Sequence, residues 1–458
     1  MQRERLRNRL GFILLSAGCA IGIGNVWKFP YITGQNGGGI FVLIYLFFLL
    51  VMGIPVMTME FSLGRASRKS PVKLYQMLEP KGTKWHIHGY LALIAQYLLM
   101  MFYTAVAGWM VKYCVSMGTG IFIGLDSEGI AAVFGGVLSN PGEMILYTYI
   151  VIAIGFFVAS FGLQNGIERV TKYMMIALLL IMIALAVNSF FMEGGRAGLE
   201  FYLLPSVENL KSVGVGKVIV SAMNQAFFTL SLGIGAMAIF GSYIGKERTL
   251  LGESINVAAL DTLVAIVSGL IIFPACSAHN LEVDSGPNLI FITLPNLFRD
   301  LPLGRLWGSL FFIFLSFAAL STVFAVFESI IACTCDIFKC SRKKACLCNF
   351  LLMLVMALPC VLGFNVLSGF QPMGDGSTIM DIEDFLVSNI LLPLGSLCYV
   401  LFCTSKHGWG WDNFVNEANI GKGVKVRKWM YGYMKFILPI MILIVFAFGM
   451  IDTIPKFF

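Results

Sequence analysis

Apolar runs long enough to cross a lipid bilayer recur along the whole of this chain. A helix needs about 20 apolar residues to span the hydrocarbon core, and eleven such runs begin near Gly11, Gly39, His88, Glu143, Tyr173, Gly216, Glu253, Pro302, Cys346, Ile382 and Met430. Of the 458 residues, 58% are hydrophobic and 12% are charged, whereas soluble domains carry about 25% charged residues. The sequence therefore predicts an all-α integral membrane protein with no soluble catalytic domain.

The basic residues indicate how the spans are oriented. With a cytoplasmic N-terminus, 24 of the 32 Lys and Arg residues fall in the N-terminal tail and the cytoplasmic loops, and the first outer loop, residues 118–142, contains none. Such an excess marks the cytoplasmic side of membrane proteins. The tail "MQRERLRNRL" is similar to the start of a signal peptide, but no cleavage site follows it. We therefore predict a multi-pass protein of the inner or plasma membrane, with a cytoplasmic N-terminus and an external C-terminus.

The charge and the cysteines argue against other classes of protein. The net charge of +7 is accounted for by this asymmetry, so the lipid bilayer and not a nucleic acid is the expected partner. Five of the eleven cysteines lie between residues 333 and 348, with C-x-C spacing and irregular gaps, whereas a zinc site favours C-x-x-C pairs. We interpret them as reduced structural thiols, and no cofactor is expected.

The first apolar run is interrupted. The stretch "AGCAIGIGNVWKFP", residues 17–30, lies inside it yet contains three glycines, an asparagine, a lysine and a proline. Gly18 and Gly22 also fit close packing between helices. Packing does not explain Asn25 or Lys28, because a lysine deep in a span costs about 2.5–3.5 kcal/mol. A nucleotide-binding glycine loop is excluded since that motif follows a strand.

A second interrupted run lies about 200 residues later. The stretch "NQAFFTLSLGIGAM", residues 224–237, carries Thr229, Ser231, Gly233 and Gly235 in mid-membrane. Interrupted spans at matching positions of two halves point to a transporter binding site. An unwound turn frees backbone carbonyls for a cation, and the half-helix after it offers N–H groups to a carboxylate. This pattern favours an alkali cation and an amino acid as ligands.

Other polar residues lie in or near apolar spans. Glu60, Asp261 and Glu328 are ionisable, and such residues are costly in a membrane and usually functional; an interhelical hydrogen bond is the alternative. Ser321 and Thr322 can instead bond to their own helix backbone. The sequence therefore predicts functional roles for the carboxylates and leaves the two hydroxyl groups open.

These motifs, in this order, resemble the neurotransmitter:sodium symporter family, whose bacterial members carry amino acids. The resemblance covers nearly the whole chain and is carried by "RLGFILLSAGCAIGIGNVWKFPYITGQNGGGIF", "GIPVMTMEFSLGR", "FFTLSLGIGA", "NLIFITLPNLF" and "LSTVFAVFES". It implies two inverted five-helix repeats, with discontinuous helices 1 and 6, plus one extra C-terminal span. We expect an N-terminal tail and inner gate in residues 1–10, repeats in 11–195 and 196–405, and a cytoplasmic loop with the last span in 406–458.

The resemblance implies two sodium ions as coupling ions. The first sodium site maps to the Ala20 carbonyl and the side chains of Asn25, Thr229 and Asp261. The second maps to the carbonyls of Gly18, Ile21 and Ala318 and the hydroxyl groups of Ser321 and Thr322.

The resemblance also implies a substrate site between the broken helices. The substrate carboxylate would meet the backbone of Gly22 to Gly24, the Tyr103 hydroxyl and the first sodium ion. The amine would meet carbonyls of Ala20, Phe228, Thr229 and the Ser231 region. The side-chain pocket would be apolar and capped by Phe228, and its expected lining is Cys19, Ile23, Leu99, Ile234 and Val326, with Thr322 also near the substrate.

The resemblance also implies an outer and an inner gate for the substrate site, and a residue that supports the break in span six. Lys28 and Asp384 would form an outer ionic latch, in which lysine lacks the bidentate fork of the usual arginine. An inner pair would join Arg3 and Asp336 near Ser242 and Tyr243. Glu60 would accept the free N–H groups of the unwound turn in span six.

The sequence departs from the family pattern in three places. Leu6 stands where an inner-gate tryptophan is usual. Asp261 stands where animal members have an asparagine beside a chloride ion, so its fixed negative charge predicts chloride independence. The chain has eleven spans, where many members have twelve.

We therefore predict a sodium-coupled symporter that imports hydrophobic or aromatic L-amino acids by alternating access. The alternatives are a non-transporting amino-acid sensor and a ligand-gated channel on the same scaffold. A channel would need a continuous polar pore, whereas the acidic groups here stand singly. An enzyme is disfavoured because no His, Cys and Asp residues converge within any span.

Overall fold

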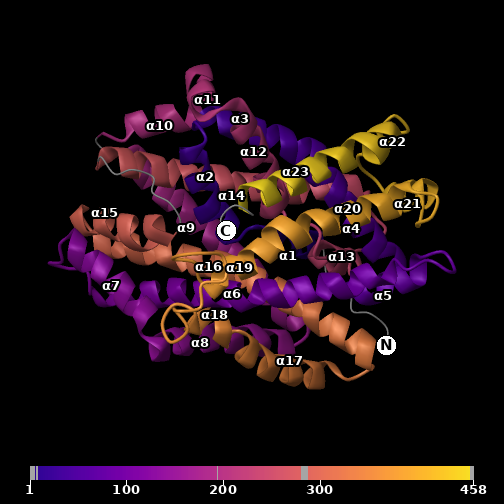
Figure 1. Ribbon diagram of the computed structural model, residues 1–458, viewed down its shortest axis with the longest axis horizontal. Helices are drawn as coiled ribbons and strands as arrows, with labels where there is room; N and C mark the ends of the chain where they lie inside the picture. Colours follow the sequence, from indigo (N-terminus) through magenta and orange to yellow (C-terminus); the bar gives the residue numbers. More distant parts are fainter. Residues whose placement is uncertain (1–5, 7–8, 193, 280–286, 454–458) are drawn as a thin grey trace.

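The computed structural model describes residue 6 and residues 9–192, 194–279 and 287–453. These residues form a bundle of long helices that run roughly side by side (Figure 1). Within the described ranges no strand is formed, and only isolated bridges join extended residues.

Among the residues that the structure describes, nine helical segments are long and apolar enough to cross a membrane. Several contain a π-helical turn, labelled η, between two α-helical parts. They are α3–η2–α4 (Gly39–Ser67), α6 (His86–Thr119), α8 (Pro141–Ser160), η3–α9 (Leu163–Phe190), α14 (Leu250–Ala278), α16 (Gly304–Phe338), α17–α18 (Arg342–Leu362), α19–η5–α20 (Ile379–Thr404) and α22–η6–α23 (Met430–Ile451).

Two further apolar segments are broken. The first consists of α1 (Arg9–Ala20) and the pair η1–α2 (Gly24–Gln35), which meet at an angle of 58°. The second consists of α12 (Val215–Thr229) and α13 (Ala236–Gly241), separated by six non-helical residues. The protein is therefore a multi-pass membrane protein, and its interrupted helices are the first and sixth in chain order, as predicted.

Span five begins earlier than its hydropathy indicates. We expected it to start near Tyr173, but the helix starts at Leu163 with η3 (Leu163–Glu168). This first turn and a half contains Gln164, Asn165 and Glu168. Hydropathy marks only the part of a helix that lies in hydrocarbon, so polar turns beyond it are not detected.

Short helices cover the two ends of the bundle. Figure 1 shows α7 (Ser127–Ser139), α10 (Arg196–Leu203) and α15 (Leu294–Asp300) at one end, and α5 (Pro71–Leu78) and α21 (Trp411–Ala418) at the other. The start of α7 is determined locally, since the Asp126 carboxylate caps it by accepting a hydrogen bond of 2.8 Å from the N–H of Gly129.

The broken helices lie at the centre of the bundle. Helix α16 packs against α1, α6 and α9, and α13 packs against α4. The most apolar part of α16 is 78% buried, whereas that of the last span is only 33% buried. The last span is therefore peripheral, and the two breaks face each other in the interior.

Candidate functional site

The break in span one is stabilised by its own asparagine. Helix α1 ends at Ala20, and the Asn25 side-chain oxygen accepts a hydrogen bond of 3.1 Å from the N–H of Gly22. A Cβ atom at Gly22 would collide with the Tyr103 hydroxyl and lie 2.7 Å from the Thr322 hydroxyl. Glycine is therefore required here, because backbone and hydroxyl groups come together at the break.

The break in span six requires positive φ angles. Ser231, Gly233 and Gly235 have φ values of +51°, +90° and +78°, a region that glycine adopts readily and other residues rarely. The Glu60 carboxylate accepts a hydrogen bond of 2.6 Å from the N–H of Gly233. Glu60 therefore lies where we expected it, against a backbone N–H group that the helix no longer uses.

Two buried amide side chains support the broken segments and were not predicted. Gln96 in α6 donates a hydrogen bond of 2.6 Å to the Ile234 carbonyl, and Gln225 in α12 donates one of 3.2 Å to the Gly24 carbonyl. Both residues are buried. A glutamine inside an apolar run was the signal that could have found them, because a buried amide needs a partner.

The predicted first ion site is assembled as a hydrogen-bonded cluster. The Asn25 side-chain nitrogen donates to Thr229 at 3.0 Å and to the Asp261 carboxylate at 2.8 Å. The Thr229 hydroxyl donates to the other Asp261 oxygen at 3.0 Å. All three residues are buried. Oxygen atoms of Thr229 and Asp261 converge on the Asn25 amide, and hydroxyl and carboxylate oxygen atoms suit a hard cation.

The predicted second ion site gathers oxygen atoms from span one and α16. The Thr322 hydroxyl lies 3.4 Å from the Gly18 carbonyl and 3.4 Å from the Ile21 carbonyl. The Ser321 hydroxyl lies 3.3 Å from the Ile21 carbonyl and 2.8 Å from the Ala318 carbonyl. The structure therefore brings together all five residues expected at this site. The Ser321 hydroxyl turns toward span one and its own helix, and the Thr322 hydroxyl turns toward span one.

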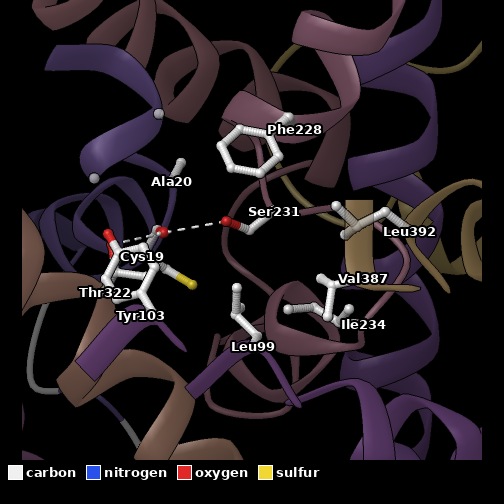
Figure 2. Close-up of a pocket in the computed structure, with 12 residues that line it drawn as sticks. Cys19, Ala20, Leu99, Tyr103, Phe228, Ser231, Ile234, Thr322, Val387 and Leu392 are labelled. Carbon is white, nitrogen blue, oxygen red and sulfur yellow. Dashed lines mark hydrogen bonds between the residues drawn. The ribbon is translucent and has the colours of Figure 1, made fainter. Parts of the chain in front are cut away.

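A small cavity of about 30 Å³ lies between the two breaks (Figure 2). Figure 2 shows Leu99, Ile234, Val387 and Leu392 on one side of it and Phe228 at one end. Tyr103 and Thr322 lie on the opposite side. The complete lining is Cys19, Ala20, Gly22, Gly24, Leu99, Tyr103, Phe228, Ser231, Ile234, Thr322, Val387 and Leu392. The cavity thus has an apolar wall facing a wall of hydroxyl and backbone groups.

Two expected lining residues, and one residue expected to bind the substrate amine, lie outside the cavity lining. Ile23 faces the outer pocket, where its N–H donates to the Tyr103 hydroxyl at 3.1 Å. Thr229 belongs to the Asn25 cluster, and Val326 is buried outside the cavity lining. Val387 and Leu392 were missed, because only tertiary packing brings their helix against the break in span six.

A family model described as the sodium:neurotransmitter symporter family matches residues 3–121 and 131–458. The chain belongs to the sodium:neurotransmitter symporter family. It is 34% identical over 441 residues to the uncharacterized sodium-dependent transporter YhdH of Bacillus subtilis, with 96% of each chain covered. It is 30% identical over 458 residues to an uncharacterized sodium-dependent transporter of Haemophilus influenzae, with 97% of this chain and 98% of that chain covered.

A solved structure has the same fold as this chain. The crystal structure of MhsT in complex with L-phenylalanine is 37% identical in sequence and superimposes with a TM-score of 0.87, covering 98% of this chain and all of that one. This symporter therefore has two inverted five-helix repeats, and it is a sodium-dependent transporter and not an enzyme.

The predicted outer gate lines a second pocket of about 210 Å³. Phe228 and Tyr103 line both this pocket and the inner cavity, so they separate the two. Lys28 and Asp384 both line the outer pocket and are both described, but they form no ion pair within 4 Å. Instead Lys28 lies 3.7 Å from the centre of the Phe228 ring, a cation–π contact, and Asp384 accepts a hydrogen bond from Ser388.

The predicted inner gate is only partly within the described residues. Arg3 lies outside them. The Asp336 carboxylate accepts a hydrogen bond of 2.8 Å from the N–H of Ser70, and the backbone N–H of Leu6, which replaces the usual tryptophan, reaches the Tyr243 carbonyl at 3.5 Å. Leu6 therefore lies beside Tyr243.

An ion pair lies beside this gate. Tyr243 donates a hydrogen bond of 2.6 Å to Glu328, and Arg342 donates one of 3.0 Å to the same carboxylate. The Ser242 carbonyl accepts a hydrogen bond of 3.2 Å from Arg68. Glu328 is buried, so an arginine and a tyrosine offset the cost of placing its charge there.

Proposed function

We propose that this protein imports hydrophobic L-amino acids together with two sodium ions, by alternating access and without chloride. The observation that carries this proposal is the cavity between the two breaks, which is lined by Gly22, the hydrogen-bond partner of Asn25, and by Thr322 of the second cluster. An amino acid in the cavity would place its carboxylate near the cluster of Asn25, Thr229 and Asp261, where an ion would neutralise it. Coupling then follows, because substrate and sodium each complete the other's site.

The walls of the cavity support a hydrophobic substrate. Leu99, Ile234, Val387 and Leu392 offer no polar side-chain group, so a polar or charged substrate side chain would be left unpaired there. The L-phenylalanine complex named for MhsT supports the same class of substrate.

The outer pocket supports an alternating-access cycle. Closing it requires Lys28 to leave the Phe228 ring and meet Asp384, which would cover the cavity from outside. We propose that the repeats 11–195 and 196–405 then rock, that the Arg3 and Asp336 pair opens, and that sodium leaves toward the cytoplasmic N-terminus. Two sodium ions crossing about 100 mV would supply roughly 4.6 kcal/mol, enough for accumulation of about a thousandfold.

A binding screen tests the substrate class. The purified protein is titrated with each of the twenty amino acids in sodium or in choline, and uptake is then measured in proteoliposomes. We expect sodium-dependent binding of aliphatic or aromatic amino acids, and concentrative uptake that stops when the sodium gradient is dissipated. Binding of only glycine or acidic amino acids would refute the substrate class, and binding without uptake would indicate a sensor.

A substitution at Asp261 tests the predicted chloride independence. We expect wild-type uptake to be unchanged when chloride is replaced by gluconate, because the carboxylate already supplies the negative charge. Asp261→Asn removes that charge, and its uptake should become dependent on chloride. The proposal fails if wild-type uptake collapses in gluconate.

A further inference from the structure

The segment that joins α21 to the last span is strongly basic. We call residues 419–429 the basic connector. Its four cationic residues, Lys422, Lys425, Arg427 and Lys428, are all exposed. The sequence contains no Asp or Glu from residue 418 to residue 436. The basic connector therefore presents a local positive charge of four.

The basic connector has a defined shape. The Asn419 side chain donates to the Val426 carbonyl at 3.0 Å and accepts from the Val426 N–H at 2.7 Å. The N–H of Lys422 donates to the Glu247 carbonyl at 3.0 Å, and the Lys422 carbonyl accepts from the Thr249 N–H at 3.3 Å. The basic side chains are thus carried on a backbone held to the neighbouring loop.

These bonds frame an open hollow of about 740 Å³. It is lined by Trp411, Val415, Asn419, Gly423, Val424, Lys425, Val426, Arg427 and Lys428. Three of the four cationic residues therefore face one space, together with two apolar side chains of α21.

The cations of the basic connector differ from three arginines on the same predicted side of the membrane. Arg65 pairs with Glu417 at 2.6 Å, Arg9 pairs with Glu253 at 2.9 Å, and Arg342 pairs with Glu328. Within the described part of the chain, no carboxylate lies within 4 Å of the four cationic groups of the basic connector. Their charge is available to an external anion.

The hollow lies next to the start of the last span. The last span begins at Met430, directly after the basic connector, and Trp429 and Val424 are 72% and 54% exposed. Tryptophan is enriched at the boundary between hydrocarbon and headgroups. Figure 1 shows α21 and α22 projecting together at one end of the bundle. Charged and apolar groups are therefore exposed together beside the first residue of this span.

We propose that the basic connector binds the headgroup of an anionic phospholipid. Lys425, Arg427 and Lys428 would donate hydrogen bonds to the phosphate oxygens, and Trp429 and Val424 would contact the acyl region. Basic clusters next to a span attract anionic lipids, with roughly a fivefold gain in binding for each Lys or Arg. A soluble phosphate compound has no acyl chains and would leave the exposed Trp429 without a partner.

A second explanation of these charges is that they only orient the protein in the membrane. That orienting bias depends on the number of charges in a loop and not on a hollow. A matched pair of variants separates the two explanations. The first changes Lys422, Lys425, Arg427 and Lys428 to Gln. The control removes four exposed lysines from other loops on the same predicted side, namely Lys81, Lys84, Lys343 and Lys344, also to Gln.

The test counts lipids bound to the purified full-length protein by native mass spectrometry, during titration with phosphatidylglycerol or phosphatidylcholine. Sodium-dependent amino-acid binding serves as the check of folding. We expect the wild type and the control variant to prefer phosphatidylglycerol by at least tenfold, and the connector variant to lose that preference. Trp429→Ala should weaken phosphatidylglycerol binding several-fold.

Two results would overturn the proposal. One is an equal loss of phosphatidylglycerol in both four-residue variants, which would indicate a general charge effect. The other is displacement of the lipid by equimolar glycerol 3-phosphate, which would indicate a site for a soluble phosphate compound.

Discussion

The Glu60 carboxylate of span two accepts a hydrogen bond of 2.6 Å from the backbone N–H of Gly233, in the unwound turn of span six. Both groups are buried. In a continuous helix the N–H of Gly233 would bond to a carbonyl of its own chain. Glu60 takes the place of that carbonyl, so a side chain from the first repeat stabilises the break in the second.

Replacing Glu60 tests this role. Glu60→Ala leaves a buried N–H group without a partner and should lower the free energy of unfolding by about 2 to 3 kcal/mol, with loss of sodium-dependent substrate binding. Glu60→Gln keeps an acceptor oxygen and should retain most of the stability. Thermal unfolding of the two purified variants checks this. Equal melting temperatures for the Ala and Gln variants would contradict it.

Thr322→Val tests the second ion site. The side chain keeps its volume but loses the hydroxyl oxygen that lies 3.4 Å from the Gly18 and Ile21 carbonyls. We expect sodium to be needed at a concentration at least tenfold higher for half-maximal substrate binding, measured by sodium titration. Ser316→Ala is the control, because the Ser316 hydroxyl bonds to the Phe312 carbonyl of its own helix. A Thr322→Val protein with the wild-type sodium dependence would remove Thr322 from the site.

Gly22→Ala tests the close approach at the break in span one. The new methyl group would lie 2.7 Å from the Thr322 hydroxyl and would collide with that of Tyr103. Both hydroxyl groups would have to move, so we expect amino-acid affinity to fall at least tenfold in a binding assay at saturating sodium. Gly216→Ala is the control, since open space surrounds Gly216 in α12. Unchanged affinity in Gly22→Ala would show that the break does not form the site.

Val387→Ala tests whether span ten limits the size of the substrate. Val387 lines the apolar wall of the cavity, and shortening it adds room for about two methyl groups. We expect affinity for phenylalanine and tryptophan to rise relative to valine, by roughly tenfold from a change of 1 to 2 kcal/mol. Val355→Ala, at an exposed position of α17, should leave the ratio unchanged. A ratio that is equally unaffected by Val387→Ala would exclude span ten from specificity.

The sequence named most residues of the candidate site, whose roles remain predictions, and missed a definable part of it. Asn25, Thr229, Asp261, Ser321 and Thr322 were expected to supply oxygen ligands, and the structure gathers them into two clusters. The resemblance to known symporters named these positions, and all of them except Asp261 lie within the motifs that carry it.

The side of the cavity formed by span ten was not predicted. Val387 and Leu392 are ordinary apolar residues within an apolar run, so no local signal separates them from lipid-facing neighbours. Their position depends on Gly395, whose place against the Gly233 carbonyl leaves no room for a side chain. That contact joins residues far apart in the chain and cannot be inferred from either stretch alone.

The sequence by itself determined the spans and the two breaks. A bilayer requires about 20 apolar residues for each crossing, and glycines with polar side chains inside such a run mark where the helix is interrupted. Both signals are local, so they can be read along the chain.

Only the tertiary structure decided which faces of the helices meet. It placed Gln96 on the Ile234 carbonyl, and it placed Lys28 over Phe228 and not beside Asp384. The reason is physical: all faces of a buried span are apolar, so packing between distant segments, and not hydropathy, selects the residues that line the site.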